Sequence, residues 1–136
     1  MFAPMFLATI NKRKQLLYLS FIGRVSVEEL ERAHIDIAGL LDELTSGFRL
    51  LADFSPLDSM DINGTREIGK TMELCEQKGV GLVVRIIPNP GKDIGLNILS
   101  AFHYRHRPRI VTCVSLLEAG EVLGLGEPGG PNDETA

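Results

Sequence analysis

Hydrophobic and polar positions along the chain follow two different periods. Residues 5–10 and 16–22 are apolar runs of strand length that flank a polar turn, which predicts a β-hairpin. Residues 27–45 carry apolar side chains at intervals of three and four, which predicts a helix with one buried stripe. The chain is therefore expected to begin with two strands and to continue with a helix.

The start of this helix has the pattern of a capping box. The hydroxyl of Ser26 can accept a hydrogen bond from the amide of Glu29, and the Glu29 carboxylate can accept one from the amide of Ser26. Gly47 stands where a left-handed C-terminal cap is expected. Both ends of the first helix are therefore marked in the sequence.

Strand and helix patterns alternate along the rest of the chain. The predicted strands are residues 48–54, 80–87 and 109–114, the predicted helices are 64–78, 94–105 and 115–123, and residues 55–63 are predicted to be a polar loop. Strands that are joined through helices run parallel with right-handed crossovers. We therefore expect an α/β fold with an initial hairpin, then right-handed βα units and a mostly parallel sheet of about five strands. Residues 1–123 would form a single domain and residues 124–136, rich in Gly and Pro, a disordered tail.

Polar side chains within the predicted strands suggest how the sheet is covered. Parallel strands that are buried on both faces are usually unbroken apolar runs, whereas apolar and polar residues alternate in these strands. The polar residues taken to lie on one face are Tyr18, Ser20, Arg49, Asp53, Arg85, Arg109 and Thr112. We expect helices mainly on the other face, which leaves this one for solvent, the N-terminal strand or a partner.

Composition narrows the class of protein. The 136 residues include 14 basic and 18 acidic side chains, and the net charge of −4 argues against non-specific nucleic-acid binding. Every hydrophobic run is shorter than the roughly 18 apolar residues that span a bilayer, so no membrane segment is expected. Cys75 and Cys113 both lie in apolar stretches, which favours two buried, reduced thiols in a reducing compartment such as the cytoplasm.

The segment from Leu50 to Gly64, LLADFSPLDSMDING, resembles the central motif of STAS domains, the fold of anti-sigma-factor antagonists and of cytoplasmic domains of sulphate transporters. In that motif an apolar strand ends in Asp-x-Ser, and a short loop leads to Asp-Ser-Ser-Gly at the start of a helix. Asp53, Asp61 and Gly64 are in register with it. The resemblance implies a STAS-like fold and a partner protein, such as a kinase or an anti-sigma-factor-like regulator.

One position departs from the family pattern. In the antagonists, the resemblance implies that the first Ser after the second Asp is phosphorylated and that this switches partner binding off. This chain has Ile62 at that position and Asn63 at the next. A side chain without a hydroxyl cannot accept a phosphoryl group, and Ser59 and Thr65 are close but out of register. We therefore expect partner binding without the usual serine switch.

The partner-binding residues predicted from this segment are Asp58, Ser59, Asp61, Ile62, Asn63, Gly64 and Thr65. A helix N-terminus presents unpaired amides and a partial positive charge, so it can hold an anion or be capped by a side chain. Asp61 and Asn63 are suitable capping residues. Capping alone is therefore the competing interpretation of these side chains.

A second candidate is a basic cluster that could contact an anion, formed by His103, Arg105, His106, Arg107 and Arg109. Its competing interpretation is a set of cations that complement the C-terminal end of the predicted helix 94–105. His103 and His106 could share one face of that helix, but a third ligand at a recognisable spacing is missing. We expect neither a metal site nor a cofactor.

These observations favour a non-enzymatic regulatory domain that binds a protein, because the sequence offers no recognisable set of nucleophile, base and metal ligands. The alternative is a module that binds a small ligand, namely an anion, a nucleotide or a lipid. A homodimer that buries the half-polar sheet face is compatible with either function.

Overall fold

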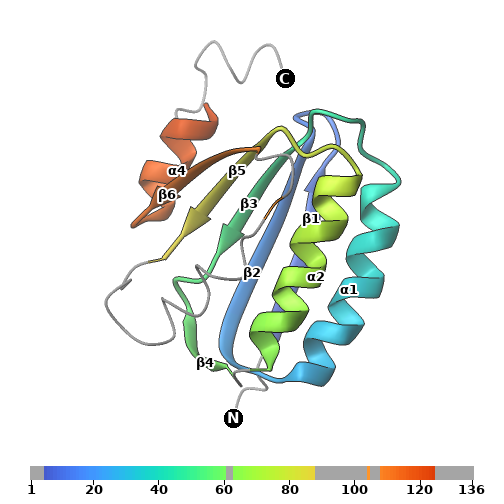
Figure 1. The fold of residues 1–136 in the computed structure, drawn as a ribbon. Coiled ribbons are helices and arrows are strands. Elements are labelled where there is room, and N and C mark those ends of the chain that lie inside the picture. The colour runs from blue at the N-terminus through green and yellow to red at the C-terminus, as the bar shows by residue number, and fades with distance from the viewer. Residues whose placement is uncertain (1–4, 61–62, 88–103, 105–107, 125–136) are drawn as a thin grey trace.

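The computed structural model describes residues 5–60, 63–87, 104 and 108–124, and these form a six-stranded sheet with helices on both faces (Figure 1). The strands are β1 (Met5–Asn11), β2 (Leu16–Val25), β3 (Arg49–Asp53), β4 (Leu57–Met60), β5 (Leu82–Ile86) and β6 (Arg109–Cys113), and the helices are α1 (Val27–Leu41), α2 (Gly64–Gln77) and α4 (Leu116–Leu123).

The sheet has the order β1-β2-β3-β5-β6, and β4 pairs with the end of β2. β1 and β2 are antiparallel, and every other pairing is parallel. The predicted hairpin followed by a mostly parallel sheet is therefore confirmed, with six strands in place of about five. α1 and α2 lie side by side on one face of the sheet, and α4 packs on the other (Figure 1).

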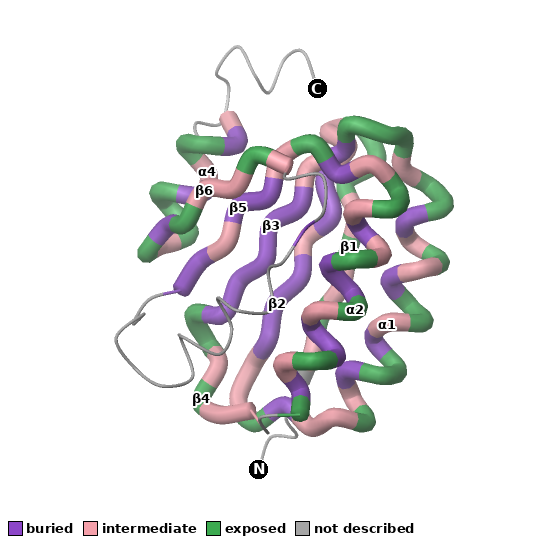
Figure 2. Tube along the Cα trace, viewed as in Figure 1, coloured by how far each residue is buried: buried purple, intermediate pink, exposed green. Residues whose placement is uncertain are grey.

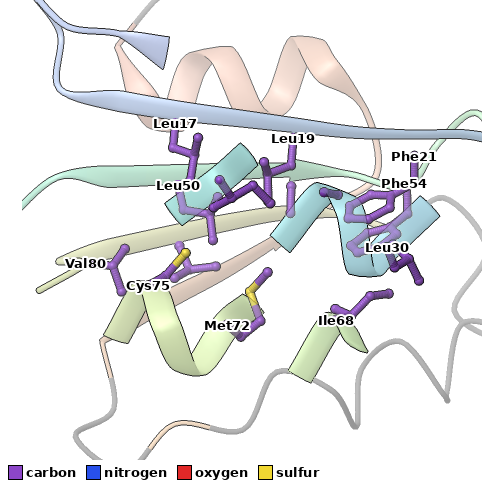
Figure 3. Close-up of a cluster of buried hydrophobic side chains, with 14 of the residues drawn as sticks. Leu17, Leu19, Phe21, Leu30, Leu50, Phe54, Ile68, Met72, Cys75 and Val80 are labelled. Carbon is purple, nitrogen blue, oxygen red and sulfur yellow. The ribbon is translucent and has the colours of Figure 1, made fainter. Parts of the chain in front are cut away.

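The main core lies between the sheet and the helices α1 and α2. Both helices bury residues at intervals of three and four: Leu30, Ala33, Ile37 and Leu41 in α1, and Ile68, Met72 and Cys75 in α2. Figure 3 shows strand side chains such as Leu17 and Leu50 on the side of the sheet where Met72 and Cys75 lie. Phe21 and Phe54 stack with their ring centroids 4.4 Å apart. The helical periodicity in the sequence thus marks the side chains that form this core.

A smaller core lies on the opposite face, under α4. It contains one set of strand residues, Leu16, Leu51, Val84, Ile86 and Cys113, together with Ala119 and Leu123 of α4. Strand register corrects the expected polar face. Arg85 pairs with Ala52 and with Thr112. Arg85 and Thr112 therefore lie on the α1–α2 face of the sheet, and not on the face that carries Tyr18 and Ser20. They hydrogen-bond each other across the strands, with Arg85 Nε 2.7 Å from Thr112 Oγ1.

The predicted loop 55–63 is wrong in part, because its middle forms β4. β2 does not end at Gly23 as expected but continues to Val25, and the backbone groups of its last residues need partners. Gly23, at a φ of +72°, donates to the carbonyl of Pro56 over 2.9 Å, and the register shifts between Gly23 and Arg24. The short segment Leu57–Met60 supplies the remaining partners, although its sequence lacks the alternation of apolar and polar residues that is typical of a strand.

The first helix is also shorter than predicted, since α1 ends at Leu41 and not near residue 45. The amide of Thr45 donates to Gln15 Oε1 over 2.8 Å, in place of a helical carbonyl. A side chain from the β1–β2 turn thus helps to end the helix. Gly47, at a φ of +93°, is left-handed as expected but lies beyond a short irregular turn.

The predictions for helix 94–105 and for a tail at 124–136 fall largely outside the described residues. Tyr104 has no regular secondary structure, and Gly124 is the left-handed cap of α4. Both cysteines are free and buried, as expected. None of the described helices is long and apolar enough to cross a membrane.

Candidate functional site

The predicted partner-binding segment begins on β4, at the end of the molecule where α2 starts (Figure 1). Asp58 is exposed and Ser59 is half-buried. Ser59 pairs with Arg24 of β2, and Arg24 Nε donates to Ser59 Oγ over 3.3 Å. The sequence did not predict a role for Arg24. Its contact with Ser59 exists only because β2 pairs with β4, and no pattern in the sequence indicates that pairing.

Asn63 is the N-cap residue of α2 and is exposed. Its backbone is helical, with φ −68° and ψ −19°, and its side chain makes no capping hydrogen bond. Ser26 and Ser115 begin the other two helices with extended backbones and accept capping hydrogen bonds. The interpretation of Asn63 as a side-chain cap is therefore wrong. Asp61 and Ile62 lie outside the described residues.

Gly64 is buried where α2, β4 and α1 meet. A Cβ atom at this position would lie 2.7 Å from Met60 Cγ and 3.0 Å from Leu30 Cδ1. The first distance is shorter than a normal van der Waals contact, so a larger residue would have to displace the Met60 side chain. Gly64 therefore permits a close junction that fixes the start of α2 against β4, with Thr65 half-buried beside it.

Asp53, the first acidic residue of the motif, is only 2% exposed. Its Oδ1 accepts from the Ser55 amide over 2.8 Å, and Tyr18 Oη lies 3.4 Å from its Oδ2. Burial is the largest cause of the raised pKa of Tyr18, and the charge of Asp53 adds to it. Asp53 thus holds the bend between β3 and β4 and does not itself reach the surface.

The basic cluster is represented in the described residues by Arg109 alone, the exposed first residue of β6. Arg109 pairs with Leu82 at the amino end of the parallel strands, whereas β4 extends the carboxyl end of β2. β6 also lies at the far side of the sheet from β2. The structure therefore does not bring Arg109 to the start of α2. His103, Arg105, His106 and Arg107 are outside the described residues.

Neither thiol has the environment of a nucleophile. Burial raises the pKa of Cys75 to about 12. Burial, followed by a hydrogen bond and the negative charge of Glu118, raises the pKa of Cys113 to about 11. Reactive cysteines have a lowered pKa, so both thiols stay protonated at neutral pH. Within the described part of the chain, no group of three His, Cys, Asp or Glu side chains could hold a metal ion.

An apolar cavity lies between β1, β2 and the two long helices, lined by Phe6, Phe21, Leu30, Ala33, Ile37, Ile68 and Thr71. Its volume is about 10 Å³. This is roughly the space that one water molecule needs. A lipid chain does not fit there without movement of α1 or α2.

Solved structures of other proteins share this fold, among them two SpoIIAA-like proteins. The anti-sigma factor antagonist SpoIIAA in its unphosphorylated form superposes with a TM-score of 0.59, at 17% identity over 88% of this chain and 98% of that chain. An uncharacterised DUF3478 protein from Shewanella loihica PV-4, with a SpoIIAA-like fold, gives 0.65, at 15% identity over 90% and 97% of the two chains. No family model and no curated protein matches the sequence. The fold is thus that of SpoIIAA, which confirms the fold that the STAS resemblance implies.

Proposed function

We propose that this protein is a non-enzymatic, cytoplasmic regulatory domain that binds a partner protein through the β4–α2 corner. We define this corner as the predicted segment Asp58, Ser59, Asp61, Ile62, Asn63, Gly64 and Thr65, together with Arg24. The partner would be a kinase or an anti-sigma-factor-like regulator, as the likeness to the antagonist SpoIIAA suggests.

The observation that carries the proposal is the tight junction at Gly64. Exposed polar groups of two elements, Asp58 on β4 and Asn63 at the start of α2, lie on either side of this junction. Preorganised side chains lose less conformational entropy when a partner binds, so such a corner is suited to docking. Arg24 and Ser59 extend this polar surface onto β2.

Binding at this corner would not depend on phosphorylation of the usual serine position. Ile62 has no hydroxyl, and the hydroxyl of Ser59 is engaged by Arg24. We therefore expect the domain to bind its partner constitutively. Mass spectrometry of the protein from growing cells should show no stoichiometric phosphate on Ser59 or Thr65, and such a phosphate would contradict the constitutive version.

The test of the docking site compares baits that differ at one side chain. Proteins captured by the wild-type chain should be lost with Asp58→Lys, which reverses a charge in the contact, and with Ile62→Glu, which introduces one. Glu43→Lys is the matched control, since Glu43 is an exposed carboxylate just beyond the far end of α1. If a purified partner binds all four proteins with the same Kd, the β4–α2 corner is not its docking site.

The alternative, a module that binds an anion, a nucleotide or a lipid, makes a different prediction. A ligand at 100 times its Kd should raise the free energy of unfolding by about 2.7 kcal/mol. Thermal unfolding with a panel of nucleotides, phosphates and fatty acids measures this. We expect no shift, and a clear shift with one compound would favour the ligand-binding function.

A further inference from the structure

Exposed apolar side chains gather at one edge of the molecule, remote from the β4–α2 corner. The exposed large hydrophobic residues of the described chain include four within one short stretch: Val114 at 62%, Leu116 at 51%, Leu117 at 76% and Val122 at 37%. They lie directly after β6 or on α4, which Figure 2 shows to be largely exposed or intermediate. We call the segment from Arg109 to Leu123 the β6–α4 edge.

β6 is the last strand in the sheet order, and within the described residues it pairs only with β5. Its outer backbone groups form an edge on which another strand can add. Natural proteins protect such edges with charges or Pro within the strand; β6 has one charge, at its first residue Arg109, and residues 110–113 carry neither charge nor Pro. Most of this edge is therefore apolar and β-prone, and no second strand among the described residues covers it.

Charges at the two ends of β6 indicate which strand fits. Arg109 is exposed and lies on the same sheet face as Cys113, because the two are four residues apart in one strand. Glu118 lies next to Cys113: its carboxylate accepts from the Val114 amide over 3.3 Å, and it interacts with the Cys113 thiol. The edge thus has a cation at one end of the strand and an anion at the other.

We propose that the β6–α4 edge binds a second copy of this chain, with the two β6 strands antiparallel about a two-fold axis at Val111. In that register Arg109 of each copy lies opposite Cys113 of the other, and so beside its Glu118. The symmetry makes this contact twice, and the apolar residues of the two edges meet on either side of the axis. A parallel arrangement would place Arg109 beside Arg109.

Charge also favours a protein over a membrane as the occupant. α4 carries two acidic residues, Glu118 and Glu121, and no basic residue, and the chain has a net charge of −4. Amphipathic helices that bind anionic lipid surfaces carry Lys and Arg on their polar face. A copy of the same edge supplies the missing cation through its Arg109.

Sedimentation equilibrium of the full chain tests the proposal. We expect a dimer at about 100 µM, a concentration at which a homodimer of micromolar Kd is almost wholly assembled. Leu117→Glu should raise the dimer Kd about tenfold or more, because it places a charge in the apolar contact. Ile35→Glu on α1 is the matched control, since Ile35 is 71% exposed, close to the value for Leu117.

Exchanged charges test the register itself. Arg109→Glu and Glu118→Lys should each raise the dimer Kd about tenfold, a loss of about 1.4 kcal/mol. A mixture of the two variants should form a heterodimer close to wild-type affinity, because both contacts again join opposite charges. Circular dichroism of each variant checks that it is folded.

Three results would overturn the proposal: a monomer at the highest concentration, a dimer unaffected by the three substitutions at the edge, or no recovery in the mixture. A monomer that instead takes up an added β6 peptide or binds lipid vesicles would also reject the second copy as the occupant. None of these outcomes depends on the β4–α2 corner.

Discussion

The two faces of the sheet are covered very differently. On one face, α1 and α2, of 15 and 14 residues, enclose the larger apolar core, although α2 also buries Glu67 and Thr71. On the other face, α4 has eight residues and packs mainly on β5 and β6. Here the strands bury the polar residues Ser20 and Asp53 among apolar ones, and α4 is also held by a hydrogen bond from Arg49 to its last carbonyl.

This difference suggests a division of roles. Apolar burial by two long helices supplies most of the stability, because the hydrophobic contribution grows with the area removed from water. A short helix on a partly polar surface contributes less and can open more readily. The α1–α2 face therefore defines the fold, while the other side of the sheet is where additional contacts are expected.

The largest expected effect comes from neighbouring leucines that point to opposite faces. Leu50 is fully buried under α1 and α2, and Leu51 is 4% exposed under α4. Leu50→Ala should lower the free energy of unfolding by about 4 kcal/mol and Leu51→Ala by about 2 to 3 kcal/mol. Urea unfolding at 25 °C measures both. Equal losses would mean that the two faces stabilise the fold equally.

Removal of the Arg49 side chain should loosen α4 selectively. Its Nη1 donates to the carbonyl of Leu123 over 2.7 Å, and its Nη2 donates to that of Lys14 over 2.9 Å. Arg49→Met should therefore cost about 1.5 to 3 kcal/mol, the range for charged hydrogen bonds. Hydrogen exchange should show faster exchange in α4 with little change in α1. Uniform loss of protection in both helices would show that α4 does not open separately.

High pH should destabilise the protein through its two thiols. In the unfolded chain they lose their protons near pH 9, the usual thiol value, whereas burial raises the pKa of Cys113 to about 11 and of Cys75 to about 12. Above pH 9 the folded state therefore holds more protons, so the free energy of unfolding falls by up to about 1.4 kcal/mol per pH unit and group. The contribution of Cys113 to the free energy of unfolding is lost by about pH 11, and that of Cys75 by about pH 12.

Urea unfolding between about pH 8 and pH 10.5 follows this loss. Cys75→Ala and Cys113→Ala should each make the pH dependence shallower. We compare the slopes of the free energy of unfolding against pH, because each substitution also changes packing and so changes the free energy of unfolding itself. A slope that is unchanged in both variants would show that other groups cause the alkaline loss.

The smallest effect is expected at the helix caps. Ser26 and Glu29 form a reciprocal capping box on α1, whereas on α4 the Ser115 hydroxyl accepts from Glu118 and the Glu118 side chain binds Val114 instead. Ser26→Ala should cost about 1 kcal/mol and Ser115→Ala about 0.5 kcal/mol. Thermal unfolding resolves the difference, and a larger cost at Ser115 would reverse the expected order.

Much of the fold could be predicted because its signals are local. The capping box at Ser26, the spacing of apolar residues in both long helices and the hairpin are as the sequence indicates. The candidate site was located less completely. The motif marked Gly64 and Asp58, but the roles of Arg24 and of β4 depend on a pairing between residues 35 positions apart.

The sequence alone determined the order of the described helices and of the strands other than β4, and the side of each long helix that is buried, because both follow from the periods of the backbone, 3.6 and 2.0. Only the tertiary structure decided which polar strand residues share a face, where α1 ends and that Leu57–Met60 is a strand. Each of these depends on register or on a distant partner, such as Ala52 opposite Arg85 or Gln15 at Thr45, and such partners leave no trace in the local pattern.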